Sequence, residues 1–378
     1  MRVAIFEINS GFDHSTHRLI NTMHKVNKQV ELTLISTEHP EKRMAVDEEM
    51  DKQYILKEFN STIKKKSIAW YWDRIFTTVN NLRKRNRLAE EYDVVNIQCT
   101  IPVFDQFYLR GLKKKTKVVY TVHDVIPPWK SMFWSMRSLR KVYSLCDALI
   151  VHSESNKRQL CELFDVDESK ITVIPSGWDM SEKKMDPATA KEQLGLSVND
   201  KCVLFYGGIR EQKGLDILID AMEGIDAVLI VGGAVPYGTT FDQYQERIDK
   251  RHIRSYIHAQ FVSDELTTIM FNAADVLVLP YKYFFSQSGV LLEGIKYGVP
   301  IVSTDVGCFR EYIDKYHIGC VCQPNNVSEL NNAIQVVLND KSIKEDRFAV
   351  ARVENTHENS SKEYLKVFRE LLNKQNDK

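Results

Sequence analysis

The chain has 378 residues, and its 51 lysine and arginine residues balance 51 aspartate and glutamate residues, so net charge gives no argument for a nucleic-acid partner. Hydrophobic residues make up 43% and charged residues 27%, which is typical of soluble globular proteins, and the length exceeds one ordinary core, so two domains are expected. No apolar run approaches the roughly 20 residues of a membrane span, and the chain opens on the strand pattern MRVAIF without a leader-like block, which favours a cytoplasmic protein.

The first half of the sequence alternates short apolar runs with amphipathic segments. Strands are expected at residues 2–8, 30–36, 93–100, 117–124, 147–154 and 171–179, and helices at 15–26, within 61–93, and at 104–115, 129–147 and 155–164. The polar stretch 38–58 shows neither pattern and is predicted to be a loop. This alternation predicts an α/β domain with a doubly wound parallel sheet.

Two loops of this first half are expected to face a ligand. In a doubly wound sheet, ligands bind beyond the carboxyl ends of the strands. Gly11, Phe12, Asp13 and His14 follow the first strand and are candidate ligand contacts, and capping of the following helix by Asp13 and His14 is the alternative. His123 ends the fourth strand, where an imidazole can donate a hydrogen bond to a phosphate or a sugar hydroxyl, and a structural histidine is the alternative.

Aromatic and basic residues are mixed within residues 61–93. Apolar side chains alternate here with lysine and arginine residues, and a helix of this composition can lie in a membrane interface; they are Ile68, Trp70, Trp72, Ile75, Phe76 and Val79. A buried apolar stripe is the alternative. Peripheral contact between the N-terminal domain and a membrane is therefore one of two open interpretations.

The second half repeats the alternation after a polar linker at residues 180–201. Strands are expected at 202–208, 227–234, 255–261, 275–280 and 301–304, helices at 215–222, 241–251, 264–273 and 289–298, and an amphipathic helix at 361–374. We therefore expect domains at 1–180 and 181–360, with a C-terminal helix within 361–378 that packs back on the first domain.

The stretch PYKYFFSQSGVLLEGIKYGVPIVST, residues 280–304, predicts a strand, a polar loop, a helix and a second strand. Free backbone N–H groups at Ser288, Gly289, Val290 and Leu291 would open this helix at the carboxyl edge of the sheet, where they and the helix dipole favour a diphosphate. Glu293, one turn later, could accept hydrogen bonds from ribose hydroxyls. An ordinary turn followed by a surface glutamate is the alternative.

A second anion-binding signal follows the first strand of the C-terminal half. Gly207 and Gly208 would let a ligand approach the backbone, and Arg210 and Lys213 place two cations at the same sheet edge. The dipole at a helix start disfavours cations, so their presence there favours a bound pyrophosphate over a solvated pair.

Several segments together resemble family 4 of the glycosyltransferases. They are GGIREQKGLDILIDAM, DVLVLPYKYFFSQSGVLLEGIKYGVPIVSTDVG, TVHD, HSES and VIPSGWD, which are spread over nearly the whole chain. The resemblance implies the GT-B fold, in which two Rossmann-like domains face each other across a cleft. It also implies that the N-terminal domain binds the acceptor, that the C-terminal domain binds a nucleotide-sugar, and that the anomeric configuration is retained.

The resemblance also implies roles for individual residues. Lys213 would contact the donor diphosphate, Glu293 the ribose, and Gly289 to Leu291 the phosphates. His123 would lie near the transferred sugar or the acceptor, with the acceptor-binding loop that contains Gly11, Phe12, Asp13 and His14 below it. Base recognition in such clefts often uses backbone groups, which are expected here around Gln260 to Val262, with Phe261 and Val262 as candidates.

Two positions depart from the family pattern. Gly208 stands where the family often has arginine, so Arg210 would act from a shifted position, and Phe285 stands where a glutamate usually holds the sugar hydroxyls.

The resulting expectation is a metal-independent hexosyltransferase that uses a nucleotide-sugar, with a UDP-sugar as the favoured donor. No cofactor is expected, and the DxD-like Asp165 to Asp167 follows a helix rather than a strand, which argues against a metal site there. The acceptor would be a glycan or a lipid-linked saccharide, as in bacterial surface polysaccharide or glycoconjugate assembly, with the protein at the inner face of the cell membrane. A catalytically weak or inactive partner subunit that binds nucleotide-sugar, and a nucleotide-sugar 2-epimerase, are the alternatives. A dehydrogenase fits worst, because neither the Gly11 loop nor the Gly207 loop completes G-x-G-x-x-G.

Overall fold

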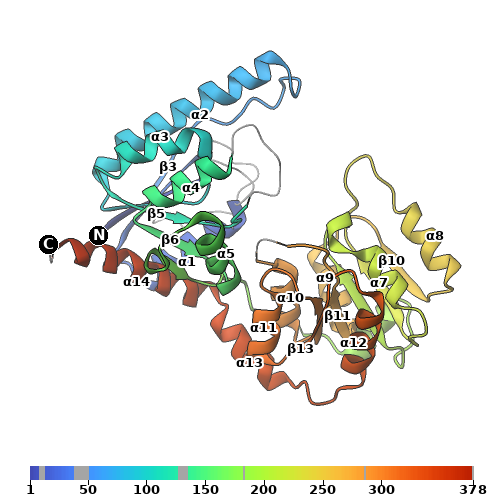
Figure 1. Cartoon of the computed structure of the whole chain (residues 1–378). Coiled ribbons are helices and arrows are strands. Elements are labelled where there is room, and N and C mark those ends of the chain that lie inside the picture. Colours follow the sequence, from blue (N-terminus) through green and yellow to red (C-terminus); the bar gives the residue numbers. More distant parts are fainter. Residues whose placement is uncertain (8–12, 38–50, 127–134, 182–183, 285–286, 377–378) are drawn as a thin grey trace. The chain divides into compact units, whose positions relative to one another are not determined.

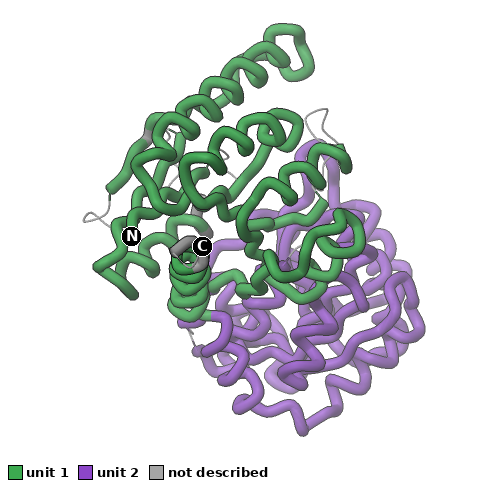
Figure 2. Tube along the Cα trace, turned by 60° about the vertical axis from the view of Figure 1, so that its left-hand side comes forward, with its two compact units in different colours: residues 1–177, 356–378 green, residues 178–355 purple. Residues whose placement is uncertain are grey.

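A computed structural model of the chain describes residues 1–7, 13–37, 51–126, 135–181, 184–284 and 287–376. The chain forms two compact units, residues 1–177 together with 356–378 (unit 1) and residues 178–355 (unit 2), as Figures 1 and 2 show. The chain therefore leaves unit 1 after Gly177 and returns to it at Thr356, whereas the sequence placed these boundaries at residues 180 and 360.

Unit 1 is built on a parallel sheet of seven strands in the order β3-β2-β1-β4-β5-β6-β7 within the described residues. The strands are β1 (Arg2–Phe6), β2 (Glu31–Thr37), β3 (Asp51–Leu56), β4 (Val94–Ile97), β5 (Lys117–Thr121), β6 (Ala148–Val151) and β7 (Ile171–Val173). Strands β4 and β6 are buried at every residue, which explains why they read as continuous apolar runs in the sequence.

Helices cover both faces of this sheet. Helices α2 (Ile68–Leu88), α3 (Pro102–Leu112), α4 (Met136–Leu145) and α5 (Glu154–Phe164) share one apolar core with strand residues such as Phe6 and Val95. Helices α1 (Asp13–Val26) and α14 (His357–Asn376) share the core on the opposite face, with strand residues such as Ile5 and Val94. Alternation of side chains along each strand produces these two cores.

Two elements of unit 1 differ from the sequence-based expectation. Residues 38–58 were expected to form a loop, but Asp51–Leu56 forms β3, which pairs in parallel with β2. This strand lies at the edge of the sheet and pairs with β2 alone, a position in which polar residues are common. One of its polar side chains, Asp51, accepts a hydrogen bond from the Thr33 hydroxyl at 3.0 Å. Residues 38–50 lie outside the described part of the chain. Helix α14 begins at His357, earlier than the expected residue 361, and packs against α1.

Unit 2 repeats the architecture with a six-stranded parallel sheet in the order β10-β9-β8-β11-β12-β13, counted over the described residues. Its strands are β8 (Cys202–Tyr206), β9 (Val228–Gly232), β10 (Ser255–His258), β11 (Val276–Leu279), β12 (Ile301–Thr304) and β13 (Gly319–Cys322). Its helices are α6 (Pro187–Gln193), α7 (Leu215–Ala221), α8 (Asp242–Lys250), α9 (Asp264–Ala273), α10 (Gly289–Tyr297), α11 (Phe309–Tyr316), α12 (Val327–Asn339) and α13 (Glu345–Glu354). The predicted α/β class with two doubly wound parallel sheets is confirmed.

Candidate functional site

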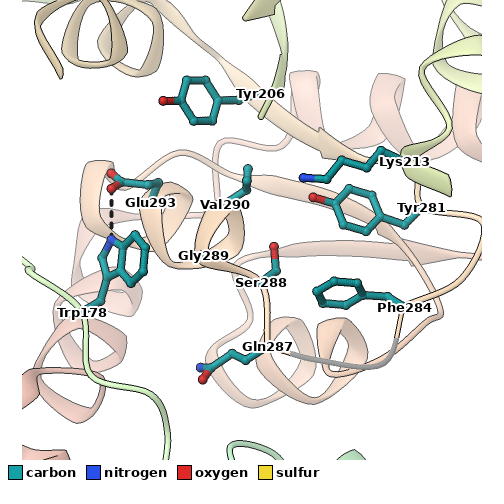
Figure 3. Close-up of a pocket in the computed structure, with 10 residues that line it drawn as sticks. All are labelled: Trp178, Tyr206, Lys213, Tyr281, Phe284, Gln287, Ser288, Gly289, Val290 and Glu293. Atoms are coloured by element: carbon teal, nitrogen blue, oxygen red, sulfur yellow. Dashed lines mark hydrogen bonds between the residues drawn. The ribbon is translucent and has the colours of Figure 1, made fainter. Parts of the chain in front are cut away.

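A cavity of about 400 Å³ lies at the carboxyl ends of β8 and β11 in unit 2. Its lining is drawn in Figure 3 and consists of Trp178, Tyr206, Lys213, Tyr281, Phe284, Gln287, Ser288, Gly289, Val290 and Glu293. This is the edge of a doubly wound sheet at which ligands bind, and the volume is within the range of ordinary small-molecule sites.

The N-terminus of α10 forms one side of the cavity. Ser288 is the N-cap, and its hydroxyl oxygen accepts a hydrogen bond from the Leu291 N–H at 3.3 Å. The Leu291 N–H is thus used by the cap and the Leu291 side chain is buried in the core, so a contact between this N–H and a phosphate stays a prediction. Gly289 and Val290 occupy the first two positions of the helix, where N–H groups have no acceptor within the helix.

Lys213 brings a cation to this helix start. It ends a short 3-10 turn, Glu211–Lys213, and its Nζ lies 4.9 Å from the centre of the Tyr281 ring. Gly207, with φ of 100°, lies beside it, since a Cβ there would be 3.1 Å from both Lys213 Nζ and Val290 Cγ2. Figure 3 shows the amine of Lys213 pointing toward Val290. A glycine at residue 207 is thus needed both for the backbone angle and for the space.

Arg210 does not join Lys213 in the lining of the cavity. Its backbone is extended immediately before the 3-10 turn, and its side chain is exposed near Gly208, where a Cβ would be 3.9 Å from Arg210 Nε. Of the two expected cations, the cavity therefore contains Lys213 alone among the described residues. Phe285, the second departure from the family pattern, lies outside the described residues.

Glu293 lies one turn into α10 and is held by Trp178. The indole Nε1–H of Trp178 donates to Oε1 of Glu293 at 3.0 Å, as the dashed line in Figure 3 marks. Oε2 is buried without a hydrogen-bond partner among the described residues, and Lys296 Nζ lies 3.8 Å from it. Burial raises the pKa of Glu293, and the opposing effects of Lys296 and Trp178 are smaller.

Two tyrosines of the cavity were not identified from the sequence. The hydroxyl of Tyr281 is buried and has no hydrogen-bond partner in the described part of the chain, whereas the hydroxyl of Tyr206 pairs with Thr267 at 2.7 Å. Tyr281 lies two residues after the end of β11, so its place after a strand was the available signal. Trp178 was visible only within the motif VIPSGWD, which carried no assigned role.

The residues expected near the base lie away from this lining. The side chain of Phe261 is 84% exposed, and its carbonyl accepts a hydrogen bond from His258 Nε2 at 3.1 Å. Val262 packs against the core of unit 2. Neither side chain lines the cavity, so a base-binding role for Phe261 and Val262 stays a prediction.

His123 belongs to unit 1, where it lines a separate small cavity. Its Nε2 lies 3.0 Å from Oε1 of Gln98, and its Nδ1 lies 3.2 Å from Nε2 of His152, which in turn donates from Nδ1 to the carbonyl of Ile174. Burial, with a smaller contribution from His152, lowers the pKa of His123 to about 3, so the imidazole is neutral at physiological pH.

The other expected acceptor contacts cannot be placed at the level of side chains. Gly11 and Phe12 lie outside the described residues, and Asp13 and His14 begin α1 with side chains that are likewise outside them.

Within the described ranges, no group of three or more His, Cys, Asp or Glu side chains is arranged to hold a metal ion. Over the same residues, none of the helices is both long enough and apolar enough to cross a bilayer.

Comparison with known proteins agrees with this architecture. The family model "Glycosyltransferase Family 4" matches residues 10–182, and the model "Glycosyl transferases group 1" matches residues 186–352. The O-antigen chain mannosyltransferase C of Escherichia coli is 26% identical over 69% of this chain and 69% of its own length, while other relatives match over about half of theirs.

Solved structures show the same fold over the whole chain. Sucrose-phosphate synthase from Thermosynechococcus elongatus superposes with a TM-score of 0.75 at 16% identity and covers 98% of this chain and 99% of its own. Anabaena HepE in complex with UDP and glucose superposes with a TM-score of 0.71 at 17% identity, covering 98% of this chain and 100% of its own. The two family models account for nearly the full length, and the chain belongs to the family 4 type of glycosyltransferases with the GT-B fold.

Proposed function

We propose that this protein transfers a sugar from a nucleoside diphosphate sugar, with a UDP-sugar as the favoured donor, to a saccharide or lipid-linked saccharide. The observation that carries the proposal is the cavity of unit 2, where Lys213, the first N–H groups of α10 and Glu293 surround one space. A cation and a helix N-terminus fit a diphosphate, and a carboxylate one turn away fits the hydroxyls of the adjoining ribose.

The chemistry follows from where charge develops. When the bond from the anomeric carbon to the diphosphate oxygen breaks, negative charge grows on the leaving phosphate, and Lys213 with the N–H groups of Gly289 and Val290 would stabilise it without a metal ion. The acceptor hydroxyl attacks the same face, and its proton passes to the departing phosphate oxygen, so the configuration is retained and no protein nucleophile is required. The neutral imidazole of His123 is our candidate for a hydrogen bond to the transferred sugar or to the acceptor.

The comparisons support a role in surface glycan assembly. Relatives carry the names O-antigen chain mannosyltransferase C and D-rhamnosyltransferase WbpZ, and one structural neighbour was solved with UDP and glucose. We infer that the acceptor here is a growing surface polysaccharide or glycoconjugate, carried on a lipid.

The donor assignment is tested with purified protein and a panel of UDP-, GDP- and ADP-sugars, with released nucleoside diphosphate as the readout. One donor should be turned over, and Lys213→Ala should lower kcat by about 10²- to 10³-fold. Lys250→Ala, an exposed lysine of α8 in the same unit, is the matched control and should behave as wild type. Full activity of Lys213→Ala would remove the leaving-group role, and nuclear magnetic resonance of the product anomer would test retention.

Two alternatives make different predictions for the same assay. An epimerase needs an acid and a base at the sugar ring, but Glu293 is the only carboxylate among the described lining residues, and it is bonded to Trp178. An inactive partner subunit would bind a nucleoside diphosphate with no turnover of any donor. Release of nucleoside diphosphate in the presence of an acceptor therefore distinguishes a transferase from an epimerase and from an inactive subunit.

We further propose that the helix layer of unit 1 binds an anionic membrane surface. Ile68, Trp72 and Phe76 are 79%, 54% and 65% exposed, and their spacing of four residues places them on one face of α2. The rings of Trp72 and Phe76 stack at 5.4 Å, and the exposed Lys64 to Lys66 precede the helix. The exposure of these three side chains supports the membrane interpretation, whereas Trp70, Ile75 and Val79 of the same helix are half-buried.

A basic groove in the same helix layer supports this surface. Helices α2, α3 and α4 pack in succession, and a groove of about 590 Å³ beside α3 and α4 includes Phe107, which is 69% exposed. Its cations are Arg110, Arg137, Arg140, Lys141 and Lys170, against the carboxylates of Asp165 and Asp167. Exposed aromatic rings beside an excess of cations fit the interface of an anionic bilayer.

Co-sedimentation with vesicles tests this second proposal. Binding should require anionic lipid, and Trp72→Ser combined with Phe76→Ser should weaken it by roughly tenfold or more, because each buried aromatic ring contributes about 1.5–3 kcal/mol. Tyr237→Ser removes an exposed aromatic ring of unit 2 and is the control. Equal binding to neutral vesicles, or no effect of the α2 variant, would contradict the proposal.

A further inference from the structure

Trp178 joins two parts of the donor cavity, the Glu293 carboxylate and the start of α10. It is the first residue of unit 2, and its indole N–H is bonded to Oε1 of Glu293 at 3.0 Å. Its six-membered ring lies against the start of α10, where a Cβ on Gly289 would come within 2.9 Å of Trp178 Cη2. Gly289 therefore provides the space that lets the indole reach the carboxylate (Figure 3).

The backbone of Trp178 is fixed as well as its side chain. Its N–H donates to the carbonyl of Asn355, the last residue of unit 2, at 2.9 Å. Asn355 is fully buried, its side-chain oxygen accepts from the Tyr312 hydroxyl at 3.1 Å, and that hydroxyl accepts from Gln287 at 2.6 Å. Gln287 itself lines the cavity. The backbone of Trp178 is consequently linked through Asn355 and Tyr312 to Gln287, so both ends of this hydrogen-bonded chain lie at the cavity.

The two oxygens of the Glu293 carboxylate therefore have different surroundings. Oε1 is used by the indole, and Oε2 has no hydrogen-bond partner among the described residues. A carboxylate held at one oxygen cannot rotate freely, so the other oxygen keeps one direction. A ligand hydroxyl then finds an acceptor whose orientation has already been fixed, which lowers the entropic cost of binding.

We propose that Trp178 is a positioning residue for the donor site, which orients Glu293 so that Oε2 accepts from the ribose hydroxyls of the nucleoside diphosphate. This inference rests on the proposed function and deepens it, because it assigns a source of affinity and of preference for ribose over deoxyribose. The indole acts through the carboxylate and makes no contact with the reacting atoms.

The direct test is Trp178→Phe, which keeps an aromatic ring against Gly289 and removes the N–H. Isothermal titration with UDP, with 2′,3′-dideoxyuridine diphosphate and with inorganic pyrophosphate separates the ribose contact from the phosphate contact. We expect the Kd for UDP to rise by about tenfold, the loss typical of a hydrogen bond to a charged group, while the other two ligands bind within about twofold of wild type. Circular dichroism and the melting temperature show whether the variant is folded.

A double-variant cycle excludes a merely structural effect. In a Glu293→Ala background, Trp178→Phe should change UDP affinity by less than about twofold, because the residue through which it acts is missing. Equal loss of pyrophosphate binding in Trp178→Phe, or the same tenfold loss in the Glu293→Ala background, would overturn the positioning role. Tighter UDP binding by Trp178→Phe would show instead that the indole obstructs the site.

A measurement without ligand keeps this inference separate from the proposed function. Carbon-detected nuclear magnetic resonance can follow the titration of Glu293, and loss of the indole N–H should raise its pKa further, since the N–H favours the charged carboxylate. If no nucleoside diphosphate binds to the wild-type protein, the proposed function fails even when the pKa rises as expected. An unchanged pKa overturns the orienting contact itself.

Discussion

Glu293 shows how a buried carboxylate can lower the stability of a fold at neutral pH. Its carboxylate lies largely buried at the donor cavity, and burial raises its pKa above the usual value of 4.5. A raised pKa in the folded state means that the associated stability is present below pH 4.5 and is lost as the pH rises through the folded-state value. At neutral pH without ligand, the buried charged carboxylate therefore lowers the stability of the protein. A ligand hydroxyl that donates a hydrogen bond to Oε2 would reduce this cost.

Glu293→Gln should consequently stabilise the protein at pH 7.5 and weaken nucleotide binding. The amide oxygen can still accept from the Trp178 N–H, and no charge has to be buried. Thermal unfolding should show a higher Tm for the variant at pH 7.5, and the difference should shrink as the pH is lowered toward 4.5. A variant that is less stable than wild type at both pH values would contradict this account.

His123 gives the opposite pH dependence in unit 1. Its folded-state pKa of about 3 lies below the ordinary 6.5, so its stability contribution is present above pH 6.5 and is lost as the pH falls toward 3. His152 shifts in the same direction through burial. Between pH 6.5 and 5, the free energy of unfolding of the wild type should fall more steeply than that of His123→Asn. The difference between the two slopes should be about 1.4 kcal/mol per pH unit. Urea unfolding of both proteins at pH 7 and 5 measures this difference. An equal loss of unfolding free energy in the two proteins would contradict the prediction.

The residues of the site were only partly predictable from the sequence. Lys213, Gly289, Val290 and Glu293 were predicted because helix starts and strand ends have local signatures, and all four line the cavity. Trp178 was missed because its contact with Glu293 joins residues far apart in the chain. Arg210 was expected beside Lys213 but does not line the cavity, because its distance in sequence from Gly208 does not determine the direction in which its side chain leaves the turn.

At the scale of elements, apolar runs and stop signals were sufficient for most of the fold. Helix α10 was predicted because Gly298 and Pro300 follow it, and in the structure Gly298 ends it with φ of 71°. Strand β3 was missed because it is an edge strand that pairs with β2 alone, and its polar sequence DKQYIL gives little apolar pattern. Helix α14 begins before its apolar pattern does, because its first turn is polar.

The pairing of α2 with α3 depends on a buried ion pair. Arg85 Nη1 donates to Asp105 Oδ1 at 2.7 Å with both side chains fully buried, and Asp105 Oδ2 accepts from the Ile101 N–H at the start of α3. Arg85→Met should destabilise unit 1 by about 3–5 kcal/mol, because it leaves the carboxylate buried without its partner.

The matched control for that variant is on the same helix. Arg83 is exposed, so Arg83→Met should stay within about 0.5 kcal/mol of wild type in urea unfolding. Adding Asp105→Asn to Arg85→Met should recover part of the loss, because the unpaired charge is removed. A similar cost for the two arginine variants would show that the ion pair is not responsible.

At the scale of the whole molecule, the described lining of the proposed donor cavity belongs to unit 2 alone. Residues 178–355 supply every described lining residue, from Trp178 to Glu293. A nucleoside diphosphate should therefore stabilise unit 2, by about 2.7 kcal/mol at 100 times its Kd. Hydrogen exchange of the full-length protein should show added protection in β8, β11 and α10 when UDP is present. Protection confined to the helix layer of unit 1 would place the ligand elsewhere.

The discontinuous make-up of unit 1 has a consequence for synthesis on the ribosome. Tyr364, Leu365 and Phe368 of α14 complete the apolar face that β1, β4 and α1 begin. Residues 178–355 form a continuous segment and can fold as soon as they emerge, whereas the earlier-made N-terminal sheet must wait for the last helix to cover one side. Nascent chains should therefore expose that uncovered side to chaperones until translation has passed α14.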